Sequence, residues 1–214
     1  LPVIEDNYWH IGRWWHNSLE YLGILSRVKE IITDLNPINV LDFGCGDGRL
    51  ILELKKDRIL NIVGLDISET ALKYAKVFNQ NSNSNIKFVS SFDEIINNKF
   101  DLIVAMEVLE HIQENELPVV IEKLSKLLEN KGKFVVTVPT LNKQPIPSKH
   151  FRHYNLDLLR EHVSPYFNID NAEHLLKLGF MKNLIEHLMI NRFFILNWKP
   201  ARRLLKIIYE KFVL

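Results

Sequence analysis

Apolar residues gather into five short runs between residues 38 and 138 of the 214-residue chain. The runs are rich in Val, Ile, Leu and Phe, and polar segments separate them. Short apolar runs of this kind are typical of strands that are buried on both faces of a parallel sheet. We therefore predict five strands, at 38–43, 61–67, 86–90, 100–105 and 132–138.

Segments between these runs have the spacing of helices. Residues 118–128 begin with Pro118 in the first turn and are followed by Gly132, and helices are also predicted at 50–56 and 69–79. Alternating strands and helices predict an α/β fold, a doubly wound, Rossmann-like, mostly parallel sheet with helices on both faces. Ligands of such sheets bind at the carboxyl ends of the strands, near the point where the strand order reverses.

The chain divides into three parts by pattern. Residues 1–36 combine an aromatic start with helical spacing, which predicts a helical cover. Residues 37–180 form the α/β domain, and residues 181–214 are predicted to be a basic amphipathic helical extension.

The charges are nearly balanced, because 27 Lys and Arg face 26 Asp and Glu. Seven basic and two acidic residues lie in 181–214, so the rest of the chain is slightly negative. The extension suits docking on its own domain or on a second subunit, peripheral contact with an anionic membrane, or RNA phosphates. We favour docking, and the negative body argues against nucleic acid as a partner.

The single cysteine, Cys45, excludes an internal disulfide, and no run of eighteen or more apolar residues predicts a membrane-spanning helix. We expect a cytoplasmic protein, with membrane contact limited to its periphery. The chain begins at Leu1 rather than Met, so the sequence does not give the true N-terminus.

The segment "VLDFGCGDG" places alternating glycines directly after the first predicted strand. A dinucleotide fingerprint would need a third glycine where Arg49 stands, and no Gly-Lys-Ser/Thr of a phosphate loop follows. Asp66 ends the second strand, where a carboxylate can accept two hydrogen bonds from a ribose diol. These features predict a nucleoside-type cofactor that is neither NAD nor a nucleoside triphosphate.

Residues 37–140 resemble the core of the class I S-adenosylmethionine-dependent methyltransferases. The similar motifs are "LDFGCGDG", "VGLDIS", "FDLIVAMEVLEHI" and "GKFVVTVP". The resemblance implies S-adenosylmethionine as cofactor and a seven-stranded sheet whose last strand is antiparallel. Beyond "YFNIDNAEHL", however, no clear sixth and seventh strand are visible.

The same resemblance implies a set of cofactor-binding residues. The first motif would lie against the methionine moiety, the second would hold the ribose and adenine, and the residues after the third and fourth strands would complete the site. A weaker likeness to quinone-pathway enzymes adds one arginine from the aromatic start. The full set is Arg13, Asp42, Gly44, Cys45, Gly46, Asp66, Ile67, Phe92, Asp93, Met106 and Glu107.

Glu107, Glu110 and His111 follow the fourth strand, and a helix there would place all three on one face. Their oxygen and nitrogen atoms suit Mg²⁺, Mn²⁺ or Zn²⁺. The spacing resembles ubiquinone-pathway O-methyltransferases and small-RNA 3′-end ribose methyltransferases, in which these residues bind metal. Many metal-free relatives carry a similar motif, and we favour His111 as a substrate-side catalytic group over a metal site or a structural role.

A later segment, "KHFRHYN", adds His150 and His153 in front of a helix that Asn155 is expected to cap. Either histidine can serve as a general base, line the acceptor pocket or complete a metal site, and a solvated loop is the alternative. We predict O-methylation of a small-molecule, lipid-linked or glycan acceptor. A metal-dependent RNA ribose 2′-O-methyltransferase and a non-catalytic S-adenosylmethionine-binding module are the alternatives.

Overall fold

The computed structural model describes residues 19–54, 61–80, 85–175, 204 and 207. The chain separates into two compact units, one of which contains residues 29–172 and all the strands described below. The boundaries that the sequence suggests at residues 36 and 180 remain predictions. Residues 1–18 of the predicted cover lie outside the described residues, as does the predicted extension except for Leu204 and Ile207, both helical.

The described strands form one parallel sheet of five strands in the order β3-β2-β1-β4-β5. This arrangement confirms the doubly wound α/β prediction. All five apolar runs became strands; the central strands β1, β2 and β4 are the most buried, and the edge strands β3 and β5 are partly exposed. The strands are β1 (Asn39–Phe43), β2 (Asn61–Leu65), β3 (Asn85–Val89), β4 (Phe100–Met106) and β5 (Leu128–Thr137).

The helices lie close to their predicted positions. Asn155 caps the last described helix as expected, because its side chain accepts a hydrogen bond from the Leu158 amide at 2.8 Å. Two short 3₁₀ helices, η3 (Phe92–Ile95) and η4 (Leu109–His111), follow β3 and β4. The α-helices are α1 (Leu19–Leu35), α2 (Arg49–Leu54), α3 (Glu69–Asn79), α4 (Leu117–Leu127) and α5 (Leu156–Val163).

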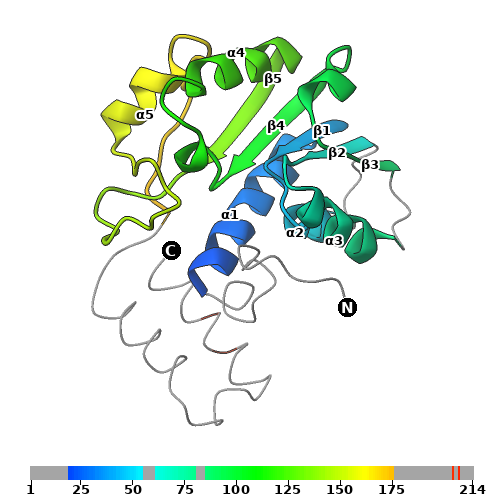
Figure 1. Ribbon diagram of the computed structural model, residues 1–214, viewed down its shortest axis with the longest axis horizontal. Coiled ribbons are helices and arrows are strands. Elements are labelled where there is room, and N and C mark those ends of the chain that lie inside the picture. Colours follow the sequence, from blue (N-terminus) through cyan, green and yellow to red (C-terminus); the bar gives the residue numbers. More distant parts are fainter. Residues whose placement is uncertain (1–18, 55–60, 81–84, 176–203, 205–206, 208–214) are drawn as a thin grey trace. The chain divides into compact units, whose positions relative to one another are not determined.

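The winding of the sheet reverses between β1 and β4. From β1 the chain crosses through α2 and α3 toward one edge, and from β4 it crosses through α4 toward the other edge (Figure 1). Because both crossovers are right-handed by rule, α2 and α3 cover one face of the sheet and α4 covers the opposite face. The carboxyl ends of β1 and β4 therefore meet at the point where a ligand crevice is expected.

The core on the α4 face consists of alternate strand residues that pack against the apolar stripe of the helix. Leu41, Ile103 and Ala105 are fully buried there, together with Leu124 of α4. A second cluster joins η4 and α4 to the segment before α5 through Leu109, Ile121 and Tyr154, all nearly inaccessible to solvent. The segment before α5 thus shares a core with the segment after β4.

Residues 166–175 contain no strand, so the described part of the chain adds nothing to the five-stranded sheet. An ion pair between Lys133 of β5 and Asp170 holds this stretch to the sheet. Among the described residues, no helix has both the length and the apolar character needed to cross a membrane.

Replacing Ile103 with alanine should leave a cavity in the middle of β4, since Ile103 is 0% exposed. We expect the free energy of unfolding to fall by about 2–5 kcal/mol in urea titrations. Ile96→Ala is the matched control, because Ile96 is 67% exposed and its truncation should change stability by no more than about 0.5 kcal/mol. Equal losses in the two variants would contradict this placement of the core.

Candidate active site

The turn after β1 requires glycine at several positions. Gly44, Gly46 and Gly48 all have positive φ, at 73°, 54° and 76°. A Cβ on Gly44 would lie 2.4 Å from Cγ2 of Val108, in the loop after β4. The loops after β1 and β4 therefore touch each other, and no side chain larger than hydrogen fits between them.

Asp66 lies at the end of β2 and is fixed by two backbone amides. Its Oδ2 accepts from the Gly46 amide and its Oδ1 accepts from the Ser68 amide, both at 2.8 Å. Each oxygen keeps a further acceptor site. Next to it, Ile67 is 88% exposed, a large apolar side chain with no cover. An oriented carboxylate beside an exposed aliphatic group is suited to a ribose and its attached base.

Asp42, the fourth residue of β1, is 3% exposed, and its Oδ2 has no hydrogen-bond partner among the described residues. Burial, and then the nearby carboxylates of Asp66 and Asp47, raise the pKa of Asp42 to about 8. A buried, unpaired carboxyl oxygen is costly unless a donor or a cation meets it. The ammonium group of a methionine moiety has the right chemistry to do so.

Cys45 is a buried free thiol inside the same turn. Burial, followed by the charge of Asp42, raises the pKa of Cys45 well above its usual range. The thiol therefore stays protonated, which supports its prediction as a small loop residue and not a nucleophile.

The residues after β3 are placed differently from one another. Phe92 is half-buried, with its ring centroid 5.6 Å from that of Phe43 and the Lys123 ammonium 5.3 Å from its own centroid. Much of the ring is thus already in contact with protein. Asp93 is exposed in η3, and Glu94 instead accepts hydrogen bonds from the amide and the hydroxyl of Ser90.

Met106 ends β4, and the chain turns sharply at Glu107, which has a φ of 56°. The Glu107 amide donates to the Thr137 carbonyl at 3.0 Å, and the Thr137 hydroxyl donates to Glu107 Oε1 at 3.0 Å. The Glu107 carboxylate is thereby directed toward the end of β5. Arg13, the remaining residue of the predicted cofactor set, lies outside the described residues.

The helix that would align Glu107, Glu110 and His111 on one face is only the single 3₁₀ turn η4, which excludes Glu107. Glu110 is 1% exposed, and its Oε2 has no hydrogen-bond partner in the part of the chain that the structure describes. Burial, and then the charge of Glu107, raise the pKa of Glu110 to about 8. The site therefore contains a second buried carboxyl group with an unmet oxygen.

Histidines from two distant segments meet beside Glu110. His111 Nε2 lies 3.9 Å from Glu110 Oε1, and the ring centroids of His111 and His150 are 4.6 Å apart. His150 Nδ1 lies 2.9 Å from Nε2 of the buried His153. Burial lowers the pKa of all three, that of His150 to about 4. At neutral pH the rings are therefore neutral, the form that accepts protons or binds metals.

The geometry suggests a metal-ligand set different from the one expected from the sequence. One ligand atom from each of Glu110, His111 and His150 lies within 4.8 Å of the others. Glu107 is not in this group, which is the one such group among the described residues. A mixed oxygen and nitrogen set with a buried carboxylate fits a divalent transition metal by its donor chemistry.

A model of the family described as "Methyltransferase domain" matches residues 14–180. This range covers most of the chain, from before α1 to beyond α5. The chain belongs to the methyltransferase domain family. The match confirms the family resemblance that the motifs at the first, second and fourth strand ends suggest.

Curated relatives include two ubiquinone biosynthesis O-methyltransferases. That of Nitrosomonas europaea is 29% identical over 143 residues, covering 62% of this chain and 59% of the relative. That of Pelagibacter ubique is 33% identical over 119 residues, covering 55% and 48%. The chain thus spans between about half and three fifths of the length of these relatives.

Solved structures share the fold of this methyltransferase domain. Magnesium protoporphyrin IX methyltransferase from Synechocystis PCC 6803, with bound S-adenosylmethionine, aligns with a TM-score of 0.56 at 21% identity. The alignment covers 75% of this chain and 76% of that structure. Because the fold is shared, the carboxyl ends of the parallel strands lie at the corresponding edge of the sheet in both proteins.

Three residues of the site are not evident from the sequence pattern. No sequence motif singles out Thr137 beyond its place at the end of β5, yet its hydroxyl donates a hydrogen bond to Glu107. Glu114 and Arg152 form an ion pair with a nitrogen-to-oxygen distance of 2.8 Å, although 38 residues separate them. The one sequence signal for this contact is Arg152 itself, which lies between His150 and His153.

The raised pKa of Asp42 predicts a pH dependence of stability. Between its ordinary pKa of 3.8 and the folded value of about 8, the folded chain keeps a proton that the unfolded chain has released. Stability of the cofactor-free protein should therefore fall as pH rises through this range, by up to about 1.4 kcal/mol per pH unit for this group. Urea unfolding at about pH 5 and pH 8 measures the difference, and Asp42→Asn should reduce it.

Asp34→Asn is the control, because Asp34 is an exposed aspartate in α1 whose substitution should leave the pH dependence unchanged. A protonated Asp42 would be contradicted if the free energy of unfolding of the wild type rose between the lower and the higher pH as much as that of Asp42→Asn.

Proposed function

We propose that this protein binds S-adenosylmethionine and transfers its methyl group to an oxygen of a small-molecule acceptor. The observation that carries the proposal is Asp66, whose two oxygens are fixed by the amides of Gly46 and Ser68 at the end of β2. The two amides orient the carboxylate before any ligand arrives. Pre-oriented acceptors bind a ribose diol without a further ordering cost.

Other groups at the same edge of the sheet are suited to the rest of the cofactor. Asp42, with its unmet Oδ2, suits the cofactor ammonium, and the positive-φ turn at Gly44 and Gly46 lets the methionine moiety approach the backbone. The exposed Ile67 suits the adenine ring. When bound, S-adenosylmethionine supplies a methyl group that its sulfonium already activates, so the protein's main tasks are alignment and proton removal.

On the acceptor side, the neutral ring of His111 can remove the proton from a hydroxyl group. The imidazolium formed would then be 3.9 Å from the Glu110 carboxyl group, whose ionised form stabilises it. His150 and the buried His153 provide a second neutral ring and its hydrogen-bond partner. A general base of this kind contributes roughly 10²–10⁴-fold in rate.

The acceptor is best described as a hydroxylated molecule with an apolar part. Leu141, Ile146 and Phe151 are 41%, 41% and 59% exposed on the segment that carries His150. Both named relatives are ubiquinone biosynthesis O-methyltransferases, which supports oxygen as the methylated atom. A lipid-linked acceptor suits this apolar surface better than a free glycan does, and RNA has no support from the charge of the body.

Removing the Asp66 carboxylate should weaken S-adenosylmethionine and S-adenosylhomocysteine binding by about 10- to 100-fold in calorimetry, since hydrogen bonds to a charged group are each worth about 1.5–3 kcal/mol. Asp66→Ala is compared with Asp101→Ala. Asp101 also accepts two backbone amides, from Ile38 at 2.7 Å and Asn39 at 3.0 Å.

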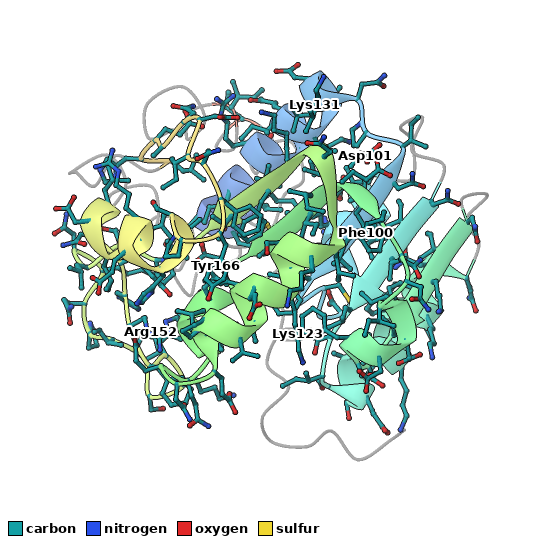
Figure 2. The ribbon with its side chains drawn as sticks, turned by 90° about the horizontal axis from the view of Figure 1, so that it is seen from above. Phe100, Asp101, Lys123, Lys131, Arg152 and Tyr166 are labelled. Carbon is teal, nitrogen blue, oxygen red and sulfur yellow. The ribbon has the colours of Figure 1, made fainter. Side chains whose placement is uncertain are left out.

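Asp101 lies at the end of the sheet away from Arg152, and both residues are labelled in Figure 2. The control should therefore lose stability but keep cofactor affinity. Absence of binding by the unaltered protein, or equal affinity losses in the two variants, would refute the proposal.

A second candidate is a metal-dependent form of the same reaction, which the clustering of Glu110, His111 and His150 supports. We expect that dialysed protein reloaded with Mn²⁺ or Zn²⁺ keeps about one metal per chain, as a three-residue ligand set provides. His150→Ala should lose the metal, whereas Glu107→Gln, whose parent carboxylate is held by Thr137, should lose less. Elemental analysis is the measurement, and a wild-type protein that neither retains nor takes up metal removes this candidate.

A further inference from the structure

The histidines of the site come from two loops that lie far apart in the sequence. His111 lies in η4 after β4, and His150 and His153 lie in the segment before α5. A backbone hydrogen bond from the Phe151 amide to the Glu110 carbonyl, at 2.8 Å, joins the two loops. A second contact joins His111 Nδ1 to the Lys149 carbonyl at 3.2 Å. Both bonds involve the end of η4, so a further contact is needed to fix the start of η4 against the His150 segment.

Arg152 provides that contact. Its side chain is 8% exposed, and it reaches from the His150 segment to η4 and the loop that follows. Nη1 donates to the Leu109 carbonyl at 3.0 Å, which is the first residue of η4. Nε and Nη2 bind Glu114 Oε2 at 2.9 Å and 2.8 Å. One guanidinium group thus holds the start of η4 and the loop before α4 at the same time.

Glu114 extends the connection to α5. Its other oxygen, Oε1, lies 3.1 Å from Nε2 of His162, whose side chain is 10% exposed. Leu109 and Tyr154 also share one apolar cluster, so the same segments are packed together below the polar contacts. The arginine, the glutamate and this cluster join four elements that the sequence separates: η4, the loop before α4, the His150 segment and α5.

We propose that Arg152 is a positioning residue that sets the separation of the His111 and His150 rings. The proposal rests on the proposed function in that these rings form the acceptor side of the site. Arg152 touches neither ring through its guanidinium group. It acts by fixing η4 against its own segment, in which Phe151 precedes it and His153 follows it.

The chemistry explains why arginine stands here. The planar guanidinium group makes three contacts at once, one with the Leu109 carbonyl and two with the Glu114 carboxylate. A lysine ammonium is a point charge on a flexible stem and cannot span a carbonyl and a carboxylate with the same rigidity. Arg152→Lys therefore keeps the charge but removes the rigid link, and Arg152→Met removes both.

Arg160→Met is the matched control. Arg160 also pairs with an acidic residue, Asp157, but the pair lies on the surface of α5, with side chains 52% and 90% exposed. Glu114→Gln is a milder variant, because Glu114 is 72% exposed and glutamine keeps an acceptor oxygen. It tests the same link if Arg152→Met does not fold.

The experiment uses the full chain with histidine rings labelled with ¹⁵N, studied by NMR at one fixed pH. In the unaltered protein we expect cross-peaks between the ring protons of His111 and His150, whose centroids are 4.6 Å apart. Arg152→Met and Arg152→Lys should lose these cross-peaks and shift the His150 ring nitrogens. Glu114→Gln should weaken them, and Arg160→Met should leave them unchanged.

Binding of S-adenosylhomocysteine is measured on the same samples. We expect unchanged affinity in the Arg152 variants, because the arginine binds Leu109 and Glu114 in the segment after β4, whereas the glycine turn and Asp66 follow β1 and β2. Cross-peaks that persist in folded Arg152→Met and Glu114→Gln would overturn the positioning role. A lack of cofactor binding in the unaltered protein would instead refute the proposed function and leave the ring readout valid.

Discussion

The reversal of winding between β1 and β4 determines where the polar chemistry of this protein can lie. Crossovers that leave these neighbouring strands in opposite directions place their helices on opposite faces, so the carboxyl ends of the two strands lead directly into loops. The glycine turn projects from one strand and η4 from the other. Every group that we relate to cofactor or acceptor lies on these loops or on their neighbours.

Two buried carboxyl groups show that this edge of the sheet is arranged for something besides stability. Within the described residues, Asp42 and Glu110 each have an oxygen without a hydrogen-bond partner, and burial raises the pKa of both. Apolar residues would stabilise these positions better, because a buried polar atom without a partner costs free energy. Such a cost is common where a ligand supplies the missing partner.

The sequence predicted the parts of the structure that depend on local pattern. The five strands, the bounds of α3 and the Asn155 cap follow from apolar runs and capping chemistry within a few residues. The geometry after β4 was not predictable in this way. Glu107 has positive φ because its amide and carboxylate are held by Thr137, thirty residues away. Contacts at such separations leave no periodic signal, so the expected helix face became a single 3₁₀ turn.

The contact between Gly44 and Val108 has a consequence for how ligands would influence each other. Because a Cβ at Gly44 would come within 2.4 Å of the valine side chain, the loop that surrounds the cofactor and the loop that leads into η4 have no free space between them. If a ligand at one half of the site shifts these loops, linkage requires that each half change the affinity of the other by the same factor.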